Sequence, residues 1–133
     1  LDVDAMRQAA RCMIGEHDFS AFRAAECQAK SPVKVLRELH IARRGETIRL
    51  EFAADAFVQH MVRNIVGSLV CIGSGRHPPA WMDELLQSRD RTRAAPPFSP
   101  AGLYLTEVDY DAAWALPPRP DVEAVETAML AGV

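Results

Sequence analysis

The residue with the clearest chemical implication is Arg63, which interrupts an apolar stretch from Phe57 to Ile72. It is the only formally charged residue between Asp55 and Arg76. An unpaired charge in apolar surroundings is strongly destabilising, so the guanidinium must meet a carboxylate, a phosphate or water in a cleft. Asp55 is eight residues away along the chain. That is more than two helical turns, so the partner must come from elsewhere in the fold.

Two interpretations of Arg63 remain open at this point. In the first, Arg63 forms a structural salt bridge with a distant acid such as Glu51 or Glu107. In the second, it faces a cleft and takes part in chemistry. The polar residues on the same side of the stretch favour the second interpretation, because they would let a ligand or another backbone approach. They are Gln59, His60, Asn64, Gly67 and Ser68.

A second candidate is a run of arginines that could bind phosphates, formed by Arg89, Arg91 and Arg93. Arg76 and His77 lie not far away in the sequence and could extend the same edge. Clustered arginines are typical of phosphate contacts, but a solvated loop would carry the same residues. The charges alone do not decide between these two interpretations.

Other kinds of site lack the required spacing. The four histidines show no H-E-x-x-H or comparable metal-ligand pattern, and the three cysteines form no C-x-x-C pair. No serine stands in G-x-S-x-G, and Gly73-Ser74-Gly75 lacks the lysine of a phosphate-binding loop. We therefore predict no metal site and no hydrolase or nucleotide-triphosphatase chemistry.

The elements that must position these residues can be outlined from periodicity. Apolar residues at helical spacing predict a helix from Asp4 to Met13 that ends at Gly15. Residues 15–22 resemble an ordered loop anchored by Phe19 and Phe22. Alternation over 33–41 and 48–52, with a turn at 43–46, predicts a β-hairpin, although Leu36 and Arg37 break the pattern.

The second half of the chain is predicted with the same rules. The stretch 57–72 has two adjacent apolar rows and should form a helix buried nearly all round. Pro78-Pro79 opens a shorter helix through Trp81 and Leu86, and a strand runs from Leu103 to about Tyr110. We expect residues 1–116 to form one half-domain and residues 117–133 a peripheral tail.

Composition limits the class of protein. The chain has 133 residues, of which 49% are hydrophobic, and this suits one domain with a real core. The net charge of −3 argues against a surface that grips nucleic acid everywhere, but a local basic face is compatible with it. Thirteen of the fifteen cations are arginine. The cysteines show no spacing pattern, which fits a reducing cytoplasm. The N-terminal residues show no charged leader followed by an apolar run. No uncharged run reaches the ~20 residues of a membrane span.

Four segments together resemble the tRNA pseudouridine synthase A family over roughly Ala9 to Tyr110. Residues 15–23 resemble its G-x-H-D-F-[ST]-x-F segment, and residues 57–67 resemble its F-x-x-H-M-V-R-N-I-V-G helix. Asp90-Arg91-Thr92 and Ala101-Gly102-Leu103-Tyr104-Leu105 resemble two later signatures in the same order. Four signatures in order are specific evidence, whereas a single apolar helix with one arginine would be weak.

The resemblance implies an α+β fold in which an antiparallel sheet packs against helices, as one half of the pseudouridine synthase fold. It implies conversion of uridine to pseudouridine in the tRNA anticodon stem-loop by a homodimer without metal or cofactor. It also implies that Arg63 pairs with a catalytic aspartate and that Leu103 packs beside the target base. We take His60, Asn64, Arg89, Arg91 and Arg93 as candidate RNA-binding residues.

One part of the family pattern is missing from this chain. The nucleophilic aspartate and the stacking tyrosine belong to the N-terminal half of the family's catalytic domain, and no Arg-Thr-Asp run precedes Leu1. We therefore expect a C-terminal half that is inactive alone, with a sheet edge that self-association could cover. The alternative is a non-catalytic RNA-binding or dimerisation domain.

Overall fold

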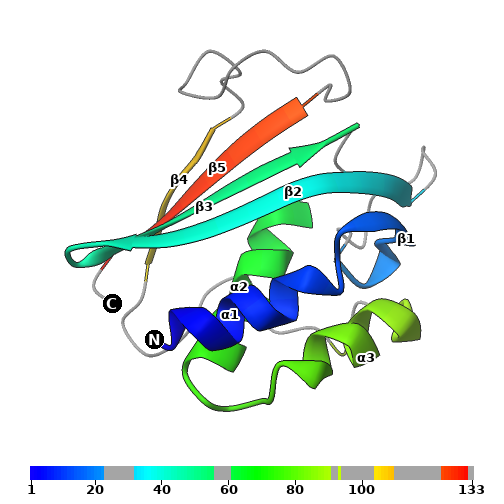
Figure 1. Cartoon of the computed structure of the whole chain (residues 1–133). Helices are drawn as coiled ribbons and strands as arrows, with labels where there is room; N and C mark the ends of the chain where they lie inside the picture. Colours follow the sequence, from blue (N-terminus) through cyan, green and yellow to red (C-terminus); the bar gives the residue numbers. More distant parts are fainter. Residues whose placement is uncertain (23–31, 56–60, 91–92, 94–103, 110–123, 132–133) are drawn as a thin grey trace.

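The computed structural model describes residues 1–22, 32–55, 61–90, 93, 104–109 and 124–131. These residues form a five-stranded antiparallel sheet in the order β1-β2-β3-β5-β4, with three α-helices against one face (Figure 1). The strands are β1 (Gly15–Asp18), β2 (Val33–Arg44), β3 (Thr47–Ala54), β4 (Tyr104–Asp109) and β5 (Ala124–Ala131). The predicted α+β class is confirmed.

The N-terminal helix, α1, spans Val3–Arg11, close to its predicted range. The Asp2 side chain caps it by accepting a hydrogen bond from the Ala5 amide at 3.1 Å, which satisfies one of the unpaired N–H groups of the first turn. Gly15 follows with a φ of 107°, a conformation that favours glycine. The chain then turns back and enters the sheet.

The expectation of an ordered loop over residues 15–22 was partly wrong. Residues Gly15–Asp18 form the short strand β1, which pairs with Val33–Leu36 of β2, and Ser20–Phe22 forms the 3-10 helix η1. Four residues are too few to show strand periodicity in a sequence. The predicted anchors are confirmed, because Phe19 and Phe22 are completely buried.

The predicted hairpin is confirmed as β2 and β3, and the break at Leu36 and Arg37 has a structural cause. Leu36 pairs with Ala54 and Glu38 pairs with Ala53, so Arg37 is the extra residue of a β-bulge. A bulge shifts the alternation by one residue. Leu36 before it and Ile41 after it are therefore both buried, although one position is even and the other odd.

Two residues, Gly45 and Glu46, connect β2 to β3, because Arg44 pairs with Thr47. Gly45 has a φ of 59°. Positive φ at the first loop position alone is the pattern of a type II′ turn, whose twist matches that of the strands. The turn fixes the hairpin register, which places Ile48, Leu50 and Phe52 of β3 in the core.

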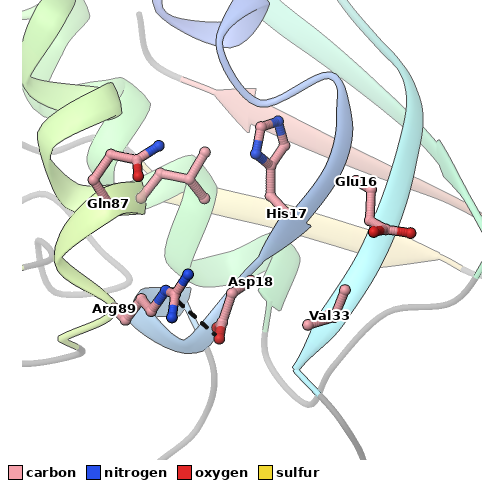
Figure 2. A pocket seen from close by; sticks show the side chains of 7 residues that line it. Glu16, His17, Asp18, Val33, Gln87 and Arg89 are labelled. Carbon is pink, nitrogen blue, oxygen red and sulfur yellow. Dashed lines mark ion pairs between the residues drawn. The ribbon is translucent and has the colours of Figure 1, made fainter.

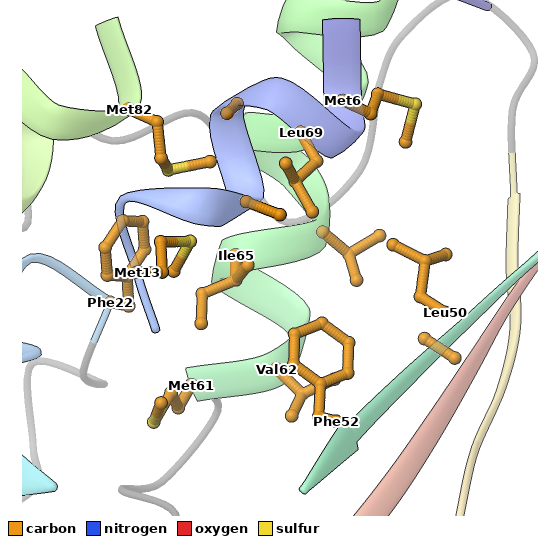
Figure 3. Packing of buried hydrophobic residues seen from close by; sticks show 14 of the residues in the cluster. Met6, Met13, Phe22, Leu50, Phe52, Met61, Val62, Ile65, Leu69 and Met82 are labelled. Carbon is orange, nitrogen blue, oxygen red and sulfur yellow. The ribbon is translucent and has the colours of Figure 1, made fainter. Parts of the chain in front are cut away.

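The helix α2 (Met61–Gly73) forms the centre of the core, as its sequence predicts. Eleven of its residues are buried, and Arg63 is its one exposed residue. Figure 3 shows α2 between α1, with Met6 and, just after the helix, Met13, and β3, which contributes Leu50 and Phe52. α3 (Ala80–Ser88) adds Met82, Leu85 and Leu86 to the same core.

The expectation that residues 117–133 form a peripheral tail was wrong for the part that the structure describes. β5 (Ala124–Ala131) lies inside the sheet and pairs along its whole length with β3. Its other edge pairs with β4, which is an outer strand (Figure 1). The segment contains helix-favouring residues and no clear alternation, so pairing with two neighbours decides its conformation rather than local propensity.

Candidate functional site

The helix α2 brings Arg63 to the surface in its first turn. The residues on either side of it, Val62 and Asn64, are both only 2% exposed, whereas Arg63 is exposed. A helix turns by about 100° per residue, so one position of an otherwise buried helix can point outward. Arg63 is thus exposed rather than enclosed by the apolar residues of α2, and its position in a cleft stays a prediction. Arg63 does not line either of the two clefts described below.

The alternative partners of Arg63 can be examined in part. Glu51 on β3 forms an ion pair with Arg49 on the same strand, with Arg49 Nε 2.9 Å from Glu51 Oε1. Both side chains are largely buried, which strengthens their attraction compared with a surface pair. Glu51 is thus already paired with Arg49. The side chain of Glu107 lies outside the described residues.

The prediction that Asn64 contacts RNA is not supported by its position. Its amide Nδ2 donates a hydrogen bond of 2.7 Å to the Phe22 carbonyl, which ties α2 to η1. A buried carbonyl needs such a partner, and an amide used in this way is not available to a ligand. Ser68 is completely buried as well. Most of the predicted polar side of α2 is therefore internal.

A cleft of about 330 Å³ lies between β1 and the C-terminal end of α3 (Figure 2). Polar and charged side chains form most of its wall, and Val33 and Leu86 are the apolar members. The lining residues are Glu16, His17, Asp18, Val33, Leu86, Gln87 and Arg89. One family-like segment, around His17 and Asp18, thus lines this cleft, and another begins in the sequence directly after the lining residue Arg89.

Asp18 contacts residues on both sides of this cleft, Ser20 after β1 and Arg89 after α3. Its Oδ1 accepts hydrogen bonds from the Ser20 amide at 2.9 Å and from the Ser20 hydroxyl at 2.5 Å. Its Oδ2 lies 3.8 Å from Arg89 Nε, as the dashed line in Figure 2 marks. Asp18 is 20% exposed and Arg89 is 65% exposed. A mostly buried, locally fixed carboxylate therefore meets a mostly solvated guanidinium.

Arg89 has an unusual backbone conformation. It ends α3 in the left-handed region with a φ of 54°, and it is the only non-glycine residue with positive φ in the described part of the chain. Glycine is favoured at such a helix end, and a residue with a Cβ costs about 1–2 kcal/mol there. A surface ion pair contributes only about 0–1 kcal/mol. The Asp18 contact alone does not offset this cost.

The remaining predicted RNA-binding residues fall in different places. Arg93 is largely exposed, and its Nε lies 3.9 Å from Asp90 Oδ2. Arg76 and His77 precede α3, whereas Arg89 follows it, so they stand at opposite ends of a helix about 13 Å long. Arg76 and His77 therefore lie apart from Arg89, and the phosphate-binding interpretation of the arginines stays a prediction. His60, Arg91 and Leu103 lie outside the described residues.

His77 forms a separate feature with Trp81 at the start of α3. Their rings stack with centroids 3.8 Å apart and an interplanar angle of 10°. A hollow of about 440 Å³ lies beside this pair, lined by residues of α1 and of the turn between α2 and α3. Its lining includes Asp2, Ile72, Arg76, Pro78 and Pro79. No pattern in the sequence predicted this stacking.

Metal and thiol chemistry can be checked within the described part of the chain. There, no three histidine, cysteine or acidic side chains gather in a way that could hold a metal ion. Cys12 and Cys71 are free thiols. Burial, with the nearby Asp83 carboxylate, raises the pKa of Cys12 to about 11, so this thiol stays protonated at neutral pH. Of the helices described, none is long and apolar enough to cross a membrane.

Sequence reasoning missed the pairing of Asp18 with Arg89. The two residues are far apart in the chain, and each looks ordinary alone. The available signal was indirect: an Arg directly after a helix, where glycine is usual, and an Asp two residues before a Ser. The pairing becomes visible only when β1 and α3 are placed side by side.

Comparison with known proteins agrees with this architecture. The family described as tRNA pseudouridine synthase matches residues 9–111, which is most of the chain. The segments that form α2, β1 and the Asp18–Arg89 cleft all lie within the match. The chain belongs to the tRNA pseudouridine synthase family.

Individual relatives make the comparison more specific. The chain is 58% identical over 117 residues to tRNA pseudouridine synthase A of Paraburkholderia phymatum, which covers 88% of the chain and 44% of that protein. It is 58% identical over 118 residues to the proteins of the same name in Burkholderia mallei and Burkholderia thailandensis, covering 89% of the chain and 44% of each relative. The chain thus spans less than half the length of these relatives.

Proposed function

We propose that this chain is the C-terminal part of an enzyme that isomerises uridine to pseudouridine in the anticodon stem-loop of tRNA. The observation that carries this proposal is the outward position of Arg63 on the otherwise buried helix α2. A charge at this place can meet a carboxylate supplied from outside the described residues. In the proposal, that carboxylate is the catalytic aspartate of the N-terminal half.

The proposed role of Arg63 is electrostatic. A guanidinium beside a carboxylate favours its ionised form, and a planar fork of N–H donors also fixes its orientation. The aspartate would then be held ready to attack the uracil ring of a flipped nucleotide. Leu103 would pack beside the base and exclude water. The isolated chain, which lacks the nucleophile, would be inactive.

Replacing Arg63 tests the role directly. In the full-length protein that contains this chain, Arg63→Ala should abolish pseudouridine formation while the Kd for tRNA changes little. Arg63→Lys should recover only part of the rate, because lysine keeps the charge but not the fork of donors. Arg11→Ala, at an exposed position near the end of α1, is a matched control with normal turnover expected.

The measurement is single-turnover formation of pseudouridine in a tRNA transcript, together with binding of the same transcript. Near-normal turnover of Arg63→Ala would remove Arg63 from the active site. Loss of binding together with turnover would instead assign Arg63 to tRNA binding. Circular dichroism of each variant confirms that α2 remains folded.

The proposal extends to the parent protein as a homodimer that acts on tRNA in the cytoplasm, without metal or organic cofactor. The alternative is a free-standing domain that binds RNA or dimerises without chemistry, with Arg89, Arg91 and Arg93 on phosphates. The reading frame upstream of Leu1 separates the two. An Arg-Thr-Asp-containing half supports the enzyme, and a native start codon at this point supports the alternative.

A further inference from the structure

We infer that the cleft between β1 and the C-terminal end of α3 is a subsite for one ribose-phosphate unit of RNA. In this subsite Arg89 contacts the phosphate, and Asp18 is a positioning residue that orients Arg89. The inference rests on the proposed function, because it takes tRNA as the ligand. It adds a contact on the face of the chain formed by β1 and α3.

The backbone of Arg89 is the first support. Arg89 occupies a left-handed helix end where glycine would be less strained. Strain at a single residue in an otherwise regular structure is typical of positions kept for function. The side chain therefore has a use that a glycine could not replace. The left-handed turn at Arg89 places its guanidinium at the mouth of the cleft (Figure 2).

The second support is the way in which Asp18 is held. Ser20 fixes one oxygen of the carboxylate through two hydrogen bonds, which leaves the other oxygen directed at Arg89 Nε. An arginine whose Nε faces a carboxylate presents its two terminal nitrogens together on the far side. These two nitrogens donate no hydrogen bond to the described part of the chain. They form the pair of donors that suits a phosphate group.

The remaining charges of the cleft favour a phosphate at Arg89 and a neutral sugar beside the acids. Glu16 and Asp18 are acids, and they oppose any anion that lies close to them, whereas a ribose carries no charge. Figure 2 shows Glu16 towards β2, whereas Arg89 points at Asp18. Carboxylate and amide oxygens of Glu16 and Gln87 can accept a hydrogen bond from a ribose 2′-hydroxyl. His17 is turned to the backbone, with its Nε2 3.0 Å from the Ile14 carbonyl oxygen.

The test uses variants that keep or relieve the local fold. Arg89→Gly removes the guanidinium and the strain together, so the full-length protein should melt at the same temperature or higher. Its Kd for tRNA should nevertheless weaken by about tenfold, the size expected for one charged hydrogen-bonded contact. The slope of log Kd against log salt should fall by about one. Arg89→Asn, which also tolerates this conformation, should behave in the same way.

Asp18→Asn tests the positioning role, because asparagine keeps an acceptor for Ser20 and loses the charge opposite Arg89. This variant should raise the Kd for tRNA by about threefold, which is about half of the change in log Kd expected for Arg89→Gly. Combined with Arg89→Gly, it should have no further effect on Kd. A purely structural role of Asp18 would instead lower the melting temperature equally in both backgrounds and leave the salt slope unchanged.

The outcomes separate this inference from the proposed function. If the wild-type protein forms pseudouridine but Arg89→Gly binds tRNA normally, the subsite is wrong and the enzyme assignment stands. If the wild type neither binds nor modifies tRNA, the proposed function fails first. A tRNA analogue with 2′-deoxy substitutions should lose affinity for the wild type more than for Arg89→Gly, and equal losses would contradict the ribose contact.

Discussion

Two adjacent residues on α2 differ in solvent exposure, and this difference determines which of them can contact a ligand. Arg63 is exposed, whereas Asn64 is buried and donates to the Phe22 carbonyl. The sequence shows that both belong to a polar side of the helix, but not where that side meets the surface. Which of them faces solvent depends on how η1 packs against α2, and periodicity does not contain that information.

The buried hydrogen bond of Asn64 leads to a stability prediction. Asn64→Ala should lower the free energy of unfolding by about 1–3 kcal/mol, because the Phe22 carbonyl loses its partner in the interior. Ser68→Ala is the matched control one turn later. Its hydroxyl has no hydrogen-bond partner in the part of the chain that the structure describes, so the change should stay within about 0.5 kcal/mol.

Urea denaturation of both variants measures this difference. A loss of tRNA affinity by Asn64→Ala without any loss of stability would restore the RNA-contact interpretation of Asn64. Equal destabilisation by both substitutions would show that burial rather than the hydrogen bond governs this side of α2.

At the scale of elements, long periodic segments were predictable and short or context-dependent ones were not. α1, α2, α3 and the β2–β3 hairpin follow from apolar spacing, caps and a glycine turn. β1 is too short for its period to be recognised, and β5 has a composition that suits a helix. Both are strands because neighbouring strands offer them hydrogen bonds.

The bulge at Arg37 leads to a prediction about β2. Deleting Arg37 would move Leu36 out of phase with the core and misalign Val35, whose amide and carbonyl both bond to Asp55. We expect a loss of at least about 2 kcal/mol in the free energy of unfolding, as for removal of a buried leucine. Arg37→Ala, which keeps the extra residue and only trims an exposed side chain, should be nearly neutral.

Thermal or urea unfolding of the deletion and of Arg37→Ala makes this comparison. A deletion variant as stable as the wild type would mean that the strand slips without cost, and that the bulge does not set its register.

At the scale of the whole molecule, the sheet has two outer strands, β1 and β4. An outer strand carries a row of backbone donors and acceptors that can pair with another chain. The resemblance to the synthase family predicted the fold class correctly, because the family-like segments of the sequence belong to helices and strands that share one core. The limit of the half-domain at residue 116 was not predictable from the sequence, because the proline-rich region ahead of β5 resembles the start of a tail.

We predict that the isolated chain associates into a symmetric dimer, because under the proposed function it would expose a surface that an N-terminal half covers. Light scattering after size exclusion should give twice the mass of the chain at micromolar concentration. Addition of the separately produced N-terminal half should replace this dimer with a complex. A monodisperse monomer would contradict the prediction.

The position of β5 also has a consequence for biosynthesis. The ribosome releases β2, β3 and β4 before β5, yet β4 joins the sheet only through β5. Until that late segment emerges, the free side of β3 is an open template on a nascent chain, and long-range pairing of this kind is slow. We therefore expect the nascent chain to need chaperones, or rapid release from the ribosome, to keep this open edge of β3 from pairing with other chains.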